Sequence, residues 1–328
     1  MNGIPVGILG TGKYAPERRL TNQDLERMVD TNDEWIVSRT GIRERRIAAE
    51  HEATSDLAYE ASVRALAAAG ITADQLDLII VATITPDMFF PSTACILQDR
   101  LGAKKAAAFD LSAACSGFIY GLANASGFIA LGTYKYALVI GADTLSRITD
   151  YTDRNTCVLF GDGAGAVVIG AVPEGRGFQS FELGADGSGG EHLRLPGGGS
   201  RVPSSERSVA ERQHFMQMNG REVFKFAARI MGNAADEALR KAGVSKEEID
   251  LLIPHQANIR IIQSSLERLN LPPEKCVINV DKYGNMSAAS IPLALAEAVE
   301  EGRVKDGDRI VLVGFGGGLT WGASVLVW

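Results

Sequence analysis

The sequence predicts an α/β protein built from two similar halves, each a buried sheet covered by helices. The first observation is an internal repeat: three short motifs recur 173 residues further along the chain. The second observation is that short apolar runs, typical of buried strands, alternate with helical stretches. Two such copies indicate two similar sheets about a pseudo-twofold axis, in halves 1–173 and 174–328. The repeated motifs are those at Gly70, Asp77 and Gly141, which reappear at Gly243, Asp250 and Gly314.

The elements of the two halves follow in the same order. In the first half, a helix over residues 55–69 ends before a glycine, and a strand over residues 78–83 follows. In the second half, a helix over roughly 221–242 also ends before a glycine, and a strand over 251–254 follows. Glycine is common just after the last turn of a helix, so both helix ends agree with the repeat. The stretch 184–212 is rich in Gly, Ser and Arg and indicates a loop between the halves.

Composition is ordinary for a globular enzyme and argues against several classes of partner. Of 328 residues, 46% are hydrophobic and 22% charged, and the net charge is −7, which disfavours binding to nucleic acid or to an anionic membrane. Four widely spaced cysteines form no CxxC motif and no disulfide framework, so we expect a reducing, cytoplasmic setting. Four scattered histidines do not suggest a metal site.

One uncharged segment imitates a membrane span. Residues 111–134 carry no charge and are long enough to cross a bilayer. The segment is rich in Gly, Ala and Ser and follows a strand-like run at 106–110, so we expect a helix buried in a soluble core. The N-terminal apolar stretch 4–9 is short and has no basic leader, which is not the pattern of a secretory signal.

Cys115 is the first candidate for chemistry. It lies where a strand-like run meets small residues and then a helix, in Phe109-Asp110-Leu111-Ser112-Ala113-Ala114-Cys115-Ser116-Gly117. Backbone N–H groups and the dipole at a helix N-terminus favour an anion, so the position predicts a lowered thiol pKa. Taken alone, a buried and inert cysteine is the better explanation of the residue, since cysteines are usually buried. The other three cysteines lack this placement.

His255 and Asn285 are the second and third candidates. His255 directly follows the strand 251–254, and the carboxyl end of a strand is where open α/β folds bind ligands. A capping or surface histidine is the alternative. Asn285 lies in a glycine turn that the repeat makes equivalent to the segment before Cys115, so the two turns should face each other across the pseudo-axis. An asparagine there is otherwise a common turn former.

Two glycine-rich segments have different interpretations. Residues 314–322 follow the strand 310–313, and their consecutive glycines suit either an oxyanion hole or a tight hairpin turn. The segment Gly10-Thr11-Gly12-Lys13-Tyr14-Ala15 matches a dinucleotide fingerprint, yet Pro16 follows where a helix would have to continue. We therefore do not expect this segment to bind a nucleotide.

Taken in order, the motifs resemble the β-ketoacyl-acyl-carrier-protein synthase III family, the initiating condensing enzymes of bacterial fatty-acid synthesis. The resemblance covers essentially the whole chain. Elongating synthases and thiolases, which share the fold, carry a different residue at the position where this chain has Asn285. The motifs that carry it are Asp33-Glu34-Trp35-Ile36-Val37, Arg39-Thr40-Gly41-Ile42-Arg43-Glu44-Arg45, Ala113-Ala114-Cys115, Phe160-Gly161-Asp162-Gly163-Ala164-Gly165, His255-Gln256-Ala257-Asn258, Gly284-Asn285 and Gly316-Gly317-Gly318-Leu319-Thr320-Trp321-Gly322.

The resemblance implies a thiolase-like fold, with two similar mixed five-stranded sheets in an α/β/α/β/α arrangement. It implies that Cys115, His255 and Asn285 form a catalytic triad, and that the N–H groups of Cys115 and Gly317 form the oxyanion hole. It also implies a coenzyme A tunnel in which Trp35 and Arg154 sandwich the adenine, since a guanidinium plane and an indole face suit a flat ring. The other matching tunnel residues are Thr31, Arg39, Gly220, Phe224, Ala227 and Asn258.

For this family the implied reaction joins an acyl-CoA starter to malonyl-acyl carrier protein, with no metal or redox cofactor. Lys225, Arg260 and Arg268 form a basic patch for the acidic carrier protein. Glu267 stands where a basic residue often occurs, and Asn155 stands where glycine is usual beside Arg154. Phe90 resembles the residue that crosses a homodimer interface to cap the acyl pocket. The sequence does not reveal which starter the pocket prefers.

Two other functions remain open at this stage. One is a related condensing enzyme of polyketide or quinolone-type biosynthesis with a partner other than malonyl. The other is a non-enzymatic acyl-CoA-binding protein that keeps the fold. Covalent acyl transfer to Cys115 distinguishes an enzyme from a binding protein, and the product formed with malonyl-carrier protein distinguishes the two enzymes.

Overall fold

The first sheet gathers five strands, which run in mixed directions. We describe residues 3–328 of a computed structural model. Strand β4, next to the edge strand β5, runs parallel to both of its neighbours, β5 and β6, whereas β7 runs antiparallel to β6 and to β1. β4 is buried at every position, which explains its uninterrupted apolar sequence. Across the sheet the order is β1 (Val6–Tyr14), β7 (Asp162–Ala171), β6 (Tyr136–Thr144), β4 (Leu78–Ala82) and β5 (Ala107–Leu111).

The second sheet repeats this order and these directions with one strand fewer. β11 is parallel to β12, and β13 is antiparallel to β12 and to β8. At the position of a fifth strand only an isolated parallel bridge joins Leu252 to Cys276. That segment leaves the short turn Pro273–Lys275 and bends into the next helix, so few of its residues are extended. The four strands, in order, are β11 (Leu251–Pro254), β12 (Arg309–Gly316), β13 (Thr320–Val327) and β8 (Gly177–Ala185).

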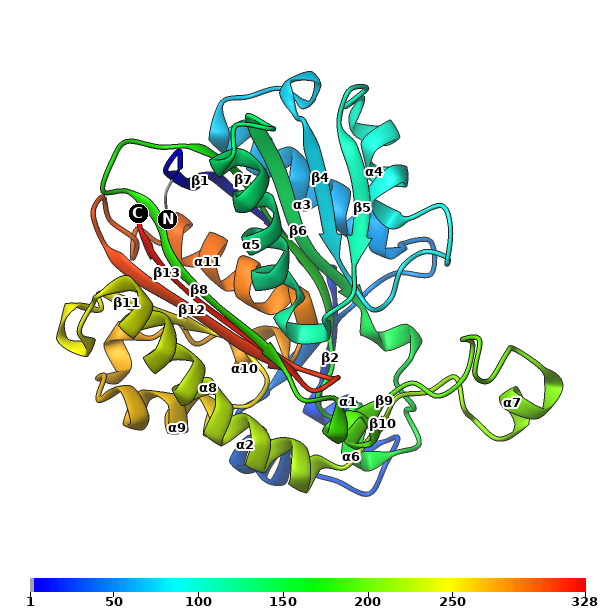
Figure 1. Ribbon diagram of the computed structural model, residues 1–328. Helices are drawn as coiled ribbons and strands as arrows, with labels where there is room; N and C mark the ends of the chain where they lie inside the picture. Colours follow the sequence, from blue (N-terminus) through cyan, green and yellow to red (C-terminus); the bar gives the residue numbers. More distant parts are fainter. Residues whose placement is uncertain (1–2) are drawn as a thin grey trace.

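Helices form three layers around the two sheets, which confirms the α/β/α/β/α prediction (Figure 1). α5 and α11 lie in the middle layer, and each contacts strands of both sheets. α3 and α4 cover the outer face of the first sheet, while α8 and α9 cover that of the second. Their bounds are α3 (Thr54–Ala69), α4 (Thr93–Leu101), α5 (Gly117–Ala130), α8 (Gly220–Ala242), α9 (Ile259–Leu269) and α11 (Ser290–Glu300).

The two central helices begin in the same way, and this places the site. A 3-10 turn, η2 (Ala114–Ser116), leads into α5, and η7 (Ser287–Ala289) leads into α11. These turns contact each other between the sheets. The interval from Ala114 to Ser287 is the 173 residues of the sequence repeat. The segment 184–212 begins at the end of β8, which already belongs to the second sheet, so it lies within the second half and does not join the halves as expected; the division at residue 173 itself stays a prediction.

The uncharged segment 111–134 forms α5, a helix buried between the sheets, as predicted. Within residues 3–328, no helix has the length and apolar character needed to span a membrane. The Gly10–Ala15 segment belongs mainly to β1 and makes no nucleotide loop. A Cβ on Gly12 would lie 2.2 Å from the Ala61 carbonyl oxygen, so glycine here permits the close approach of α3.

An arm formed by residues 195–216 projects from the body (Figure 1). Its base is the two-stranded pair of β9 and β10, and α7 lies near its tip. Arg212 at the returning end of the arm forms an ion pair with Asp150, at 2.5 Å. The remaining short elements are β2 (Arg18–Thr21), β3 (Glu44–Ile47), α1 (Asn22–Glu26), α2 (Asp33–Thr40), α6 (Arg154–Cys157), β9 (Leu193–Arg194), α7 (Glu206–Ala210), β10 (Gln217–Met218) and α10 (Val280–Tyr283).

Candidate active site

Cys115 lies in the turn η2, between β5 and the central helix α5. The first residue of this turn, Ala114, has a φ of 45°. A residue other than glycine in this region costs roughly 1–3 kcal/mol, so the surrounding structure must hold the turn in place. Because α5 begins two residues after the cysteine, Cys115 lies at the N-terminal end of this helix.

The pKa of the Cys115 thiol is the main departure from the sequence prediction. Burial raises this pKa to about 12; the nearby Ser287 side chain lowers it, and the Asp143 carboxylate raises it further. The expected lowering is therefore wrong for the resting site, because burial is the largest influence on the pKa of this thiol. A reactive thiolate must depend on hydrogen bonds supplied inside the site.

His255 follows β11 and is completely buried. Its backbone N–H donates to the Val313 carbonyl at 2.8 Å, and its ring meets Phe315 edge-on with 5.6 Å between centroids. In the part of the chain described, neither ring nitrogen has a hydrogen-bond partner. Burial lowers the pKa of the imidazole to about 3, so the ring is neutral at physiological pH. A neutral imidazole has one N–H donor to offer to a ligand.

Asn285 reaches the site from the turn after α10. Its backbone N–H donates to the Leu159 carbonyl and its carbonyl accepts from the Gly161 N–H, both at 2.9 Å. The side-chain oxygen accepts a 2.9 Å hydrogen bond from the Ser287 N–H. This contact uses the oxygen and leaves the NH2 group as a donor.

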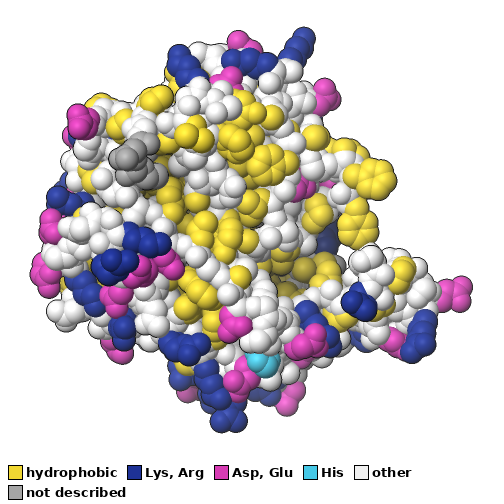
Figure 2. Space-filling view, viewed as in Figure 1, with side chains coloured by type: hydrophobic (Ala, Val, Ile, Leu, Met, Phe, Trp, Pro, Cys, Tyr) yellow, Lys and Arg dark blue, Asp and Glu magenta, His cyan; other side chains and the backbone are white. Residues whose placement is uncertain are grey.

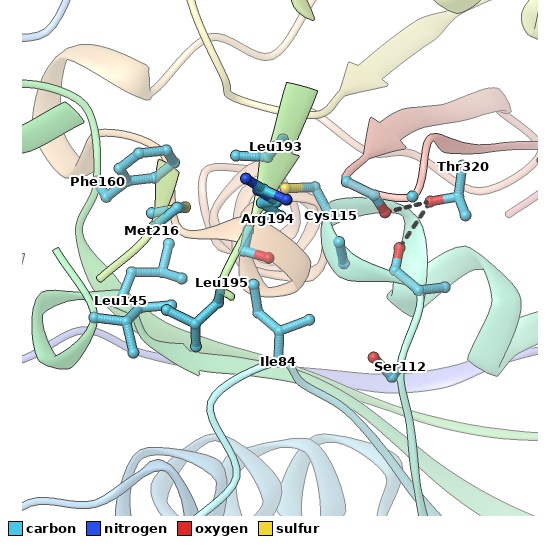
Figure 3. A pocket seen from close by; sticks show the side chains of 16 residues that line it. Ile84, Ser112, Cys115, Leu145, Phe160, Leu193, Arg194, Leu195, Met216 and Thr320 are labelled. Carbon is cyan, nitrogen blue, oxygen red and sulfur yellow. Dashed lines mark hydrogen bonds between the residues drawn. The ribbon is translucent and has the colours of Figure 1, made fainter. Parts of the chain in front are cut away.

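The glycine run 316–318 forms the turn between β12 and β13, which pair as an antiparallel hairpin. A Cβ on Gly316 would lie 2.6 Å from the backbone nitrogen of Cys115, so only glycine permits this approach. The Thr320 hydroxyl donates to the Ala113 carbonyl at 3.1 Å and ties the hairpin to the nucleophile's turn (Figure 3). The run is thus a hairpin turn that also passes directly against Cys115.

Cys115 lies where two cavities meet. The larger, of about 360 Å³, is mostly apolar and also contains Gly317. The second, of about 170 Å³, brings Cys115 together with His255 and Asn285. Cys115, Phe160 and Leu193 line both cavities, so a group bound to the sulfur can occupy one side while a second reactant enters from the other. Figure 3 shows the apolar walls of the larger cavity, which include Ile84, Leu145, Leu193, Leu195 and Met216.

Three of the eight predicted coenzyme A residues, Gly220, Phe224 and Asn258, line the second cavity. The Asn258 side chain donates to the Arg39 carbonyl at 3.0 Å, which joins α2 to the start of α9. The Thr31 hydroxyl is buried without a partner among the described residues. Ala227 lies on α8, is fully buried in the apolar core and does not line the cavity.

Trp35 and Arg154 contact each other directly. The guanidinium carbon of Arg154 lies 4.1 Å from the centroid of a Trp35 ring. A flat ring between them needs roughly 7 Å, two contacts of about 3.5 Å each. The predicted adenine site between these two residues is therefore closed in this structure, and Arg154 would have to move to admit a base.

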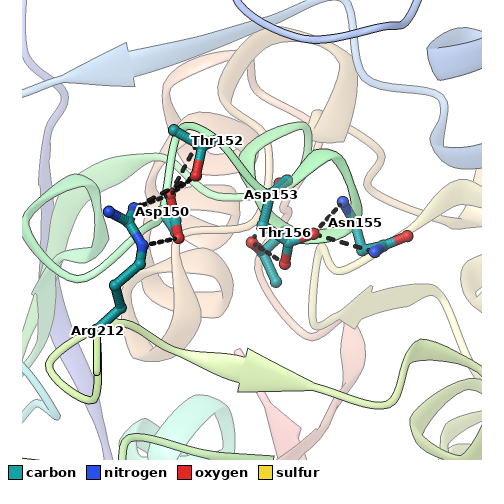
Figure 4. Close-up of polar contacts among 6 residues, drawn as sticks. All are labelled: Asp150, Thr152, Asp153, Asn155, Thr156 and Arg212. Atoms are coloured by element: carbon teal, nitrogen blue, oxygen red, sulfur yellow. Dashed lines mark hydrogen bonds and ion pairs between the residues drawn. The ribbon is translucent and has the colours of Figure 1, made fainter. Parts of the chain in front are cut away.

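Asn155 is bound to the residue that caps the short helix α6. Both its backbone N–H and its side-chain NH2 donate to one oxygen of Asp153, at 2.9 and 3.0 Å (Figure 4). The other Asp153 oxygen accepts from the Thr156 hydroxyl at 2.9 Å. This network shapes the turn that carries Arg154, so Asn155 influences the position of Arg154 through the backbone.

The three predicted carrier-docking residues are exposed but differ in charge balance. Lys225 pairs with Glu222 at 2.8 Å, and Arg268 pairs with Asp236 at 3.1 Å. Arg260 forms no ion pair within residues 3–328 and lies over the Phe224 ring, 5.2 Å from its centroid. Arg260 is therefore the member of the patch most available to an acidic partner, beside a residue that lines the second cavity.

Phe90 does not line the larger cavity of its own chain. Phe89 and Phe90 are 81% and 85% exposed, in the loop between β4 and α4. Hydrophobic side chains also gather on the face over β5 and α5 and beside the base of the arm (Figure 2). Large exposed apolar patches of this kind mark interaction surfaces.

Two stacked mixed sheets with a cysteine at the start of the central helix define a class, the condensing enzymes of the thiolase fold. Family comparison makes this assignment specific. Residues 109–187 match the model of 3-oxoacyl-[acyl-carrier-protein] synthase III, and residues 239–328 match the model of its C-terminal part. The chain belongs to the β-ketoacyl-[acyl-carrier-protein] synthase III family.

Individual relatives agree over the whole length. A β-ketoacyl-[acyl-carrier-protein] synthase III of Desulfitobacterium hafniense is 60% identical over 99% of this chain and 98% of its own. The crystal structure of 3-oxoacyl-[acyl-carrier-protein] synthase III from Aquifex aeolicus has a TM-score of 0.91 and 51% identity, covering 98% of this chain and 100% of that one. The priming β-ketosynthase of the R1128 polyketide pathway has a TM-score of 0.93 at 34% identity, covering 99% of this chain and 97% of that one.

Proposed function

We propose that this protein catalyses the decarboxylating condensation of an acyl-CoA starter, acetyl-CoA in the first instance, with malonyl-acyl carrier protein. The product is a 3-oxoacyl-acyl carrier protein, and the reaction initiates fatty-acid synthesis. The observation that carries the proposal is the position of Cys115 at the junction of an apolar cavity and a cavity containing His255 and Asn285. The direct test combines purified protein with acetyl-CoA and malonyl-carrier protein, and measures CO2 and the 3-oxoacyl product.

In the first half-reaction the Cys115 sulfur attacks the acyl carbon. A bond from sulfur to carbon forms, the bond from carbon to the coenzyme A sulfur breaks, and coenzyme A leaves with the proton that the thiol gave up. The backbone N–H groups of Cys115 and Gly317 stabilise the oxyanion. Each donor of this kind contributes about 3–4 kcal/mol to lowering the barrier. The acyl chain then occupies the larger cavity.

In the second half-reaction the malonyl group enters through the second cavity. The neutral imidazole of His255 and the NH2 group of Asn285 donate hydrogen bonds to its thioester oxygen. The bond to the carboxylate breaks, CO2 leaves, and the electron pair passes into an enolate held by these two donors. The enolate carbon attacks the acyl group on Cys115, and the cysteine sulfur leaves. The low pKa of His255 supports this role, because the ring cannot compete for a proton near neutral pH.

We assign coenzyme A to the entry formed by Trp35, Arg154 and the residues near Asn258. Adenine would lie between the indole and the guanidinium once Arg154 swings away, and Thr31, Arg39, Gly220 and Phe224 would contact the rest. Ala227 lies on the core-facing side of α8 and would not touch the ligand. No metal or redox cofactor takes part in these steps. We infer a cytoplasmic location, which the unpaired state of all four cysteines supports.

Charge reversal tests the proposed carrier-docking patch. Arg260→Glu is expected to raise the KM for malonyl-carrier protein about tenfold, because it places a like charge opposite an acidic partner. Acylation by acetyl-CoA should be unchanged. Arg268→Glu is the matched control, since Arg268 is already paired with Asp236, and its effect should be several times smaller. Equal loss in both half-reactions for Arg260→Glu would mean that this residue serves the tunnel.

We further propose a homodimer with twofold symmetry. β5 is an edge strand, and the exposed Phe89 and Phe90 lie in the loop that precedes α4. Light scattering at micromolar concentration is expected to give twice the 35.0 kDa chain mass. Phe90→Asp should weaken the dimer at least about tenfold, because it places a charge in an apolar contact. A monomeric wild-type protein would contradict the proposal, together with the assignment of Phe90 to the partner's acyl pocket.

The match to the polyketide priming ketosynthase supports a second candidate, a priming enzyme with a different downstream pathway. Both candidates use acyl transfer to Cys115. They differ in the carrier protein that accepts the acyl group, so a competition between fatty-acid and polyketide carrier proteins distinguishes them.

A further inference from the structure

Ser287 occupies the position in the second half that Ala114 occupies in the first. Each residue opens a 3-10 turn that leads into a central helix, and each has positive φ, 48° for Ser287 and 45° for Ala114. Non-glycine residues in this region are rare and gather at functional sites. The main chemical difference between the two positions is a hydroxyl group.

The Ser287 hydroxyl is buried, has no hydrogen-bond partner of ordinary geometry within residues 3–328, and lies at the wall of the larger cavity beside Cys115. Buried hydroxyl groups almost always have a partner, so an unpaired one calls for an explanation. It faces Cys115 and Asp143 closely enough to lower the pKa of both groups. The hydroxyl therefore stands between a buried thiol and a buried carboxylate.

Asp143 does not need this hydroxyl. One of its oxygens accepts from the Thr83 hydroxyl, the Ile84 N–H and the Thr85 hydroxyl, each at 2.9 Å. The other accepts from the Ala288 N–H at 3.2 Å. Four donors already satisfy most of what a carboxylate can accept, so the Ser287 proton is free to serve the sulfur.

We propose that the Ser287 hydroxyl is a catalytic hydrogen-bond donor to the Cys115 thiolate, and that Asp143 is the positioning residue that holds its turn. The hydroxyl keeps its proton and stabilises the anion that attacks the acyl carbon. This role rests on the proposed function and concerns its first half-reaction, whereas His255 and Asn285 serve the second. The charged or titratable groups facing Cys115 are Asp143 from β6, His255 after β11 and Arg194 from β9.

The test is the rate of Cys115 alkylation by iodoacetamide at one mildly alkaline pH, followed by peptide mapping because Cys95 is exposed. Ser287→Ala should fold, since Ala114 shows that alanine is accommodated at this φ. Its alkylation rate should fall about 10- to 100-fold, because losing one hydrogen bond to a charged group raises the thiol pKa by about one to two units. Acetylation by acetyl-CoA at neutral pH should slow about tenfold or more.

Two further variants exclude a purely structural explanation. Ser287→Gly relieves the backbone strain and also lacks the hydroxyl, so it should lower the alkylation rate as Ser287→Ala does. Ser290→Ala removes a neighbouring hydroxyl that accepts from the Met286 N–H at 3.2 Å, and it should leave the rate unchanged. A wild-type rate in Ser287→Ala, a decrease in the alanine but not the glycine variant, or an equal decrease in Ser290→Ala would each overturn the proposal. Alkylation needs no acyl-CoA, so failure of wild-type acetylation would instead refute the proposed function.

Discussion

Cys115→Ser is expected to lower acyl transfer from acetyl-CoA by at least about three orders of magnitude. A serine hydroxyl at this position has no thiolate-like population, and removing a nucleophile typically abolishes nearly all covalent catalysis. In the wild-type protein, incubation with acetyl-CoA alone should add one acetyl group. Intact mass measures the addition, and peptide mapping should place it on Cys115.

The other cysteines supply the controls for this experiment. Cys95 is exposed, and Cys157 and Cys276 are buried away from both cavities. Cys95→Ser should keep full acylation. An acetyl group mapped to any of these three residues would contradict the assignment of Cys115 as the nucleophile.

His255→Ala and Asn285→Ala should each lower malonyl decarboxylation by about 10²–10³-fold, the usual effect of removing one donor from a developing oxyanion. Acylation of Cys115 should persist in both variants, because the start of α5 and Ser287 supply the contacts to the sulfur. The double variant should lose less than the product of the single losses if both donors bind one oxygen. CO2 release from labelled malonyl-carrier protein measures the first property, and intact mass measures the second.

The opposite pattern would assign His255 a different role. If His255→Ala abolished acylation and spared decarboxylation, the imidazole would be the general base for the thiol. The structure makes this pattern unexpected, because the ring is fully buried with a pKa of about 3 and its desolvation disfavours proton uptake.

The sequence predicts the fold because a repeat constrains topology as well as local structure. Motifs at one offset imply equivalent strands, and equivalent strands imply equivalent sheet positions, so β4 and β11 each lie beside the strand that contains the glycine of the repeat. The repeat did not predict that the second sheet has an isolated bridge in place of a regular fifth strand. Pro272 and Pro273 interrupt the segment before Cys276, and the spacing there departs from the repeat.

Candidate residues were predictable where chemistry and position coincide. Cys115, His255 and Asn285 each lie at a strand end or an equivalent turn, and the structure brings them to one cavity. The walls of the acyl cavity were not predictable, because Ile84, Leu193 and Met216 are apolar residues on connecting segments without a periodic pattern. Asp143 carried a signal that went unused, an acidic residue at the end of a buried strand.

The sign of the Cys115 pKa shift was not predictable either. A sequence shows that a helix begins near the thiol, but it does not show how completely the thiol is removed from water. Desolvation and helix N-terminus act in opposite directions, and only packing decides which is larger. The direct contact of Trp35 with Arg154 was not predictable for the same reason. The sequence shows two residues that could stack on either side of a flat ring, but it does not show that they touch each other when no ligand lies between them.

The two facing turns η2 and η7 have a consequence for the ancestry of the molecule. A duplicated chain with equal halves would begin with two equivalent nucleophile positions, and Ala288 stands where the repeat places a second Cys115. At that position the backbone N–H, which beside Cys115 would be free for an oxyanion, is occupied by the Asp143 carboxylate. The Asp143 position in turn corresponds to Gly316, which leaves room beside Cys115. Equivalent positions in the two halves thus have different tasks, with a nucleophile and a glycine on one side and an alanine and a supporting carboxylate on the other, so substitutions in the two halves are not interchangeable.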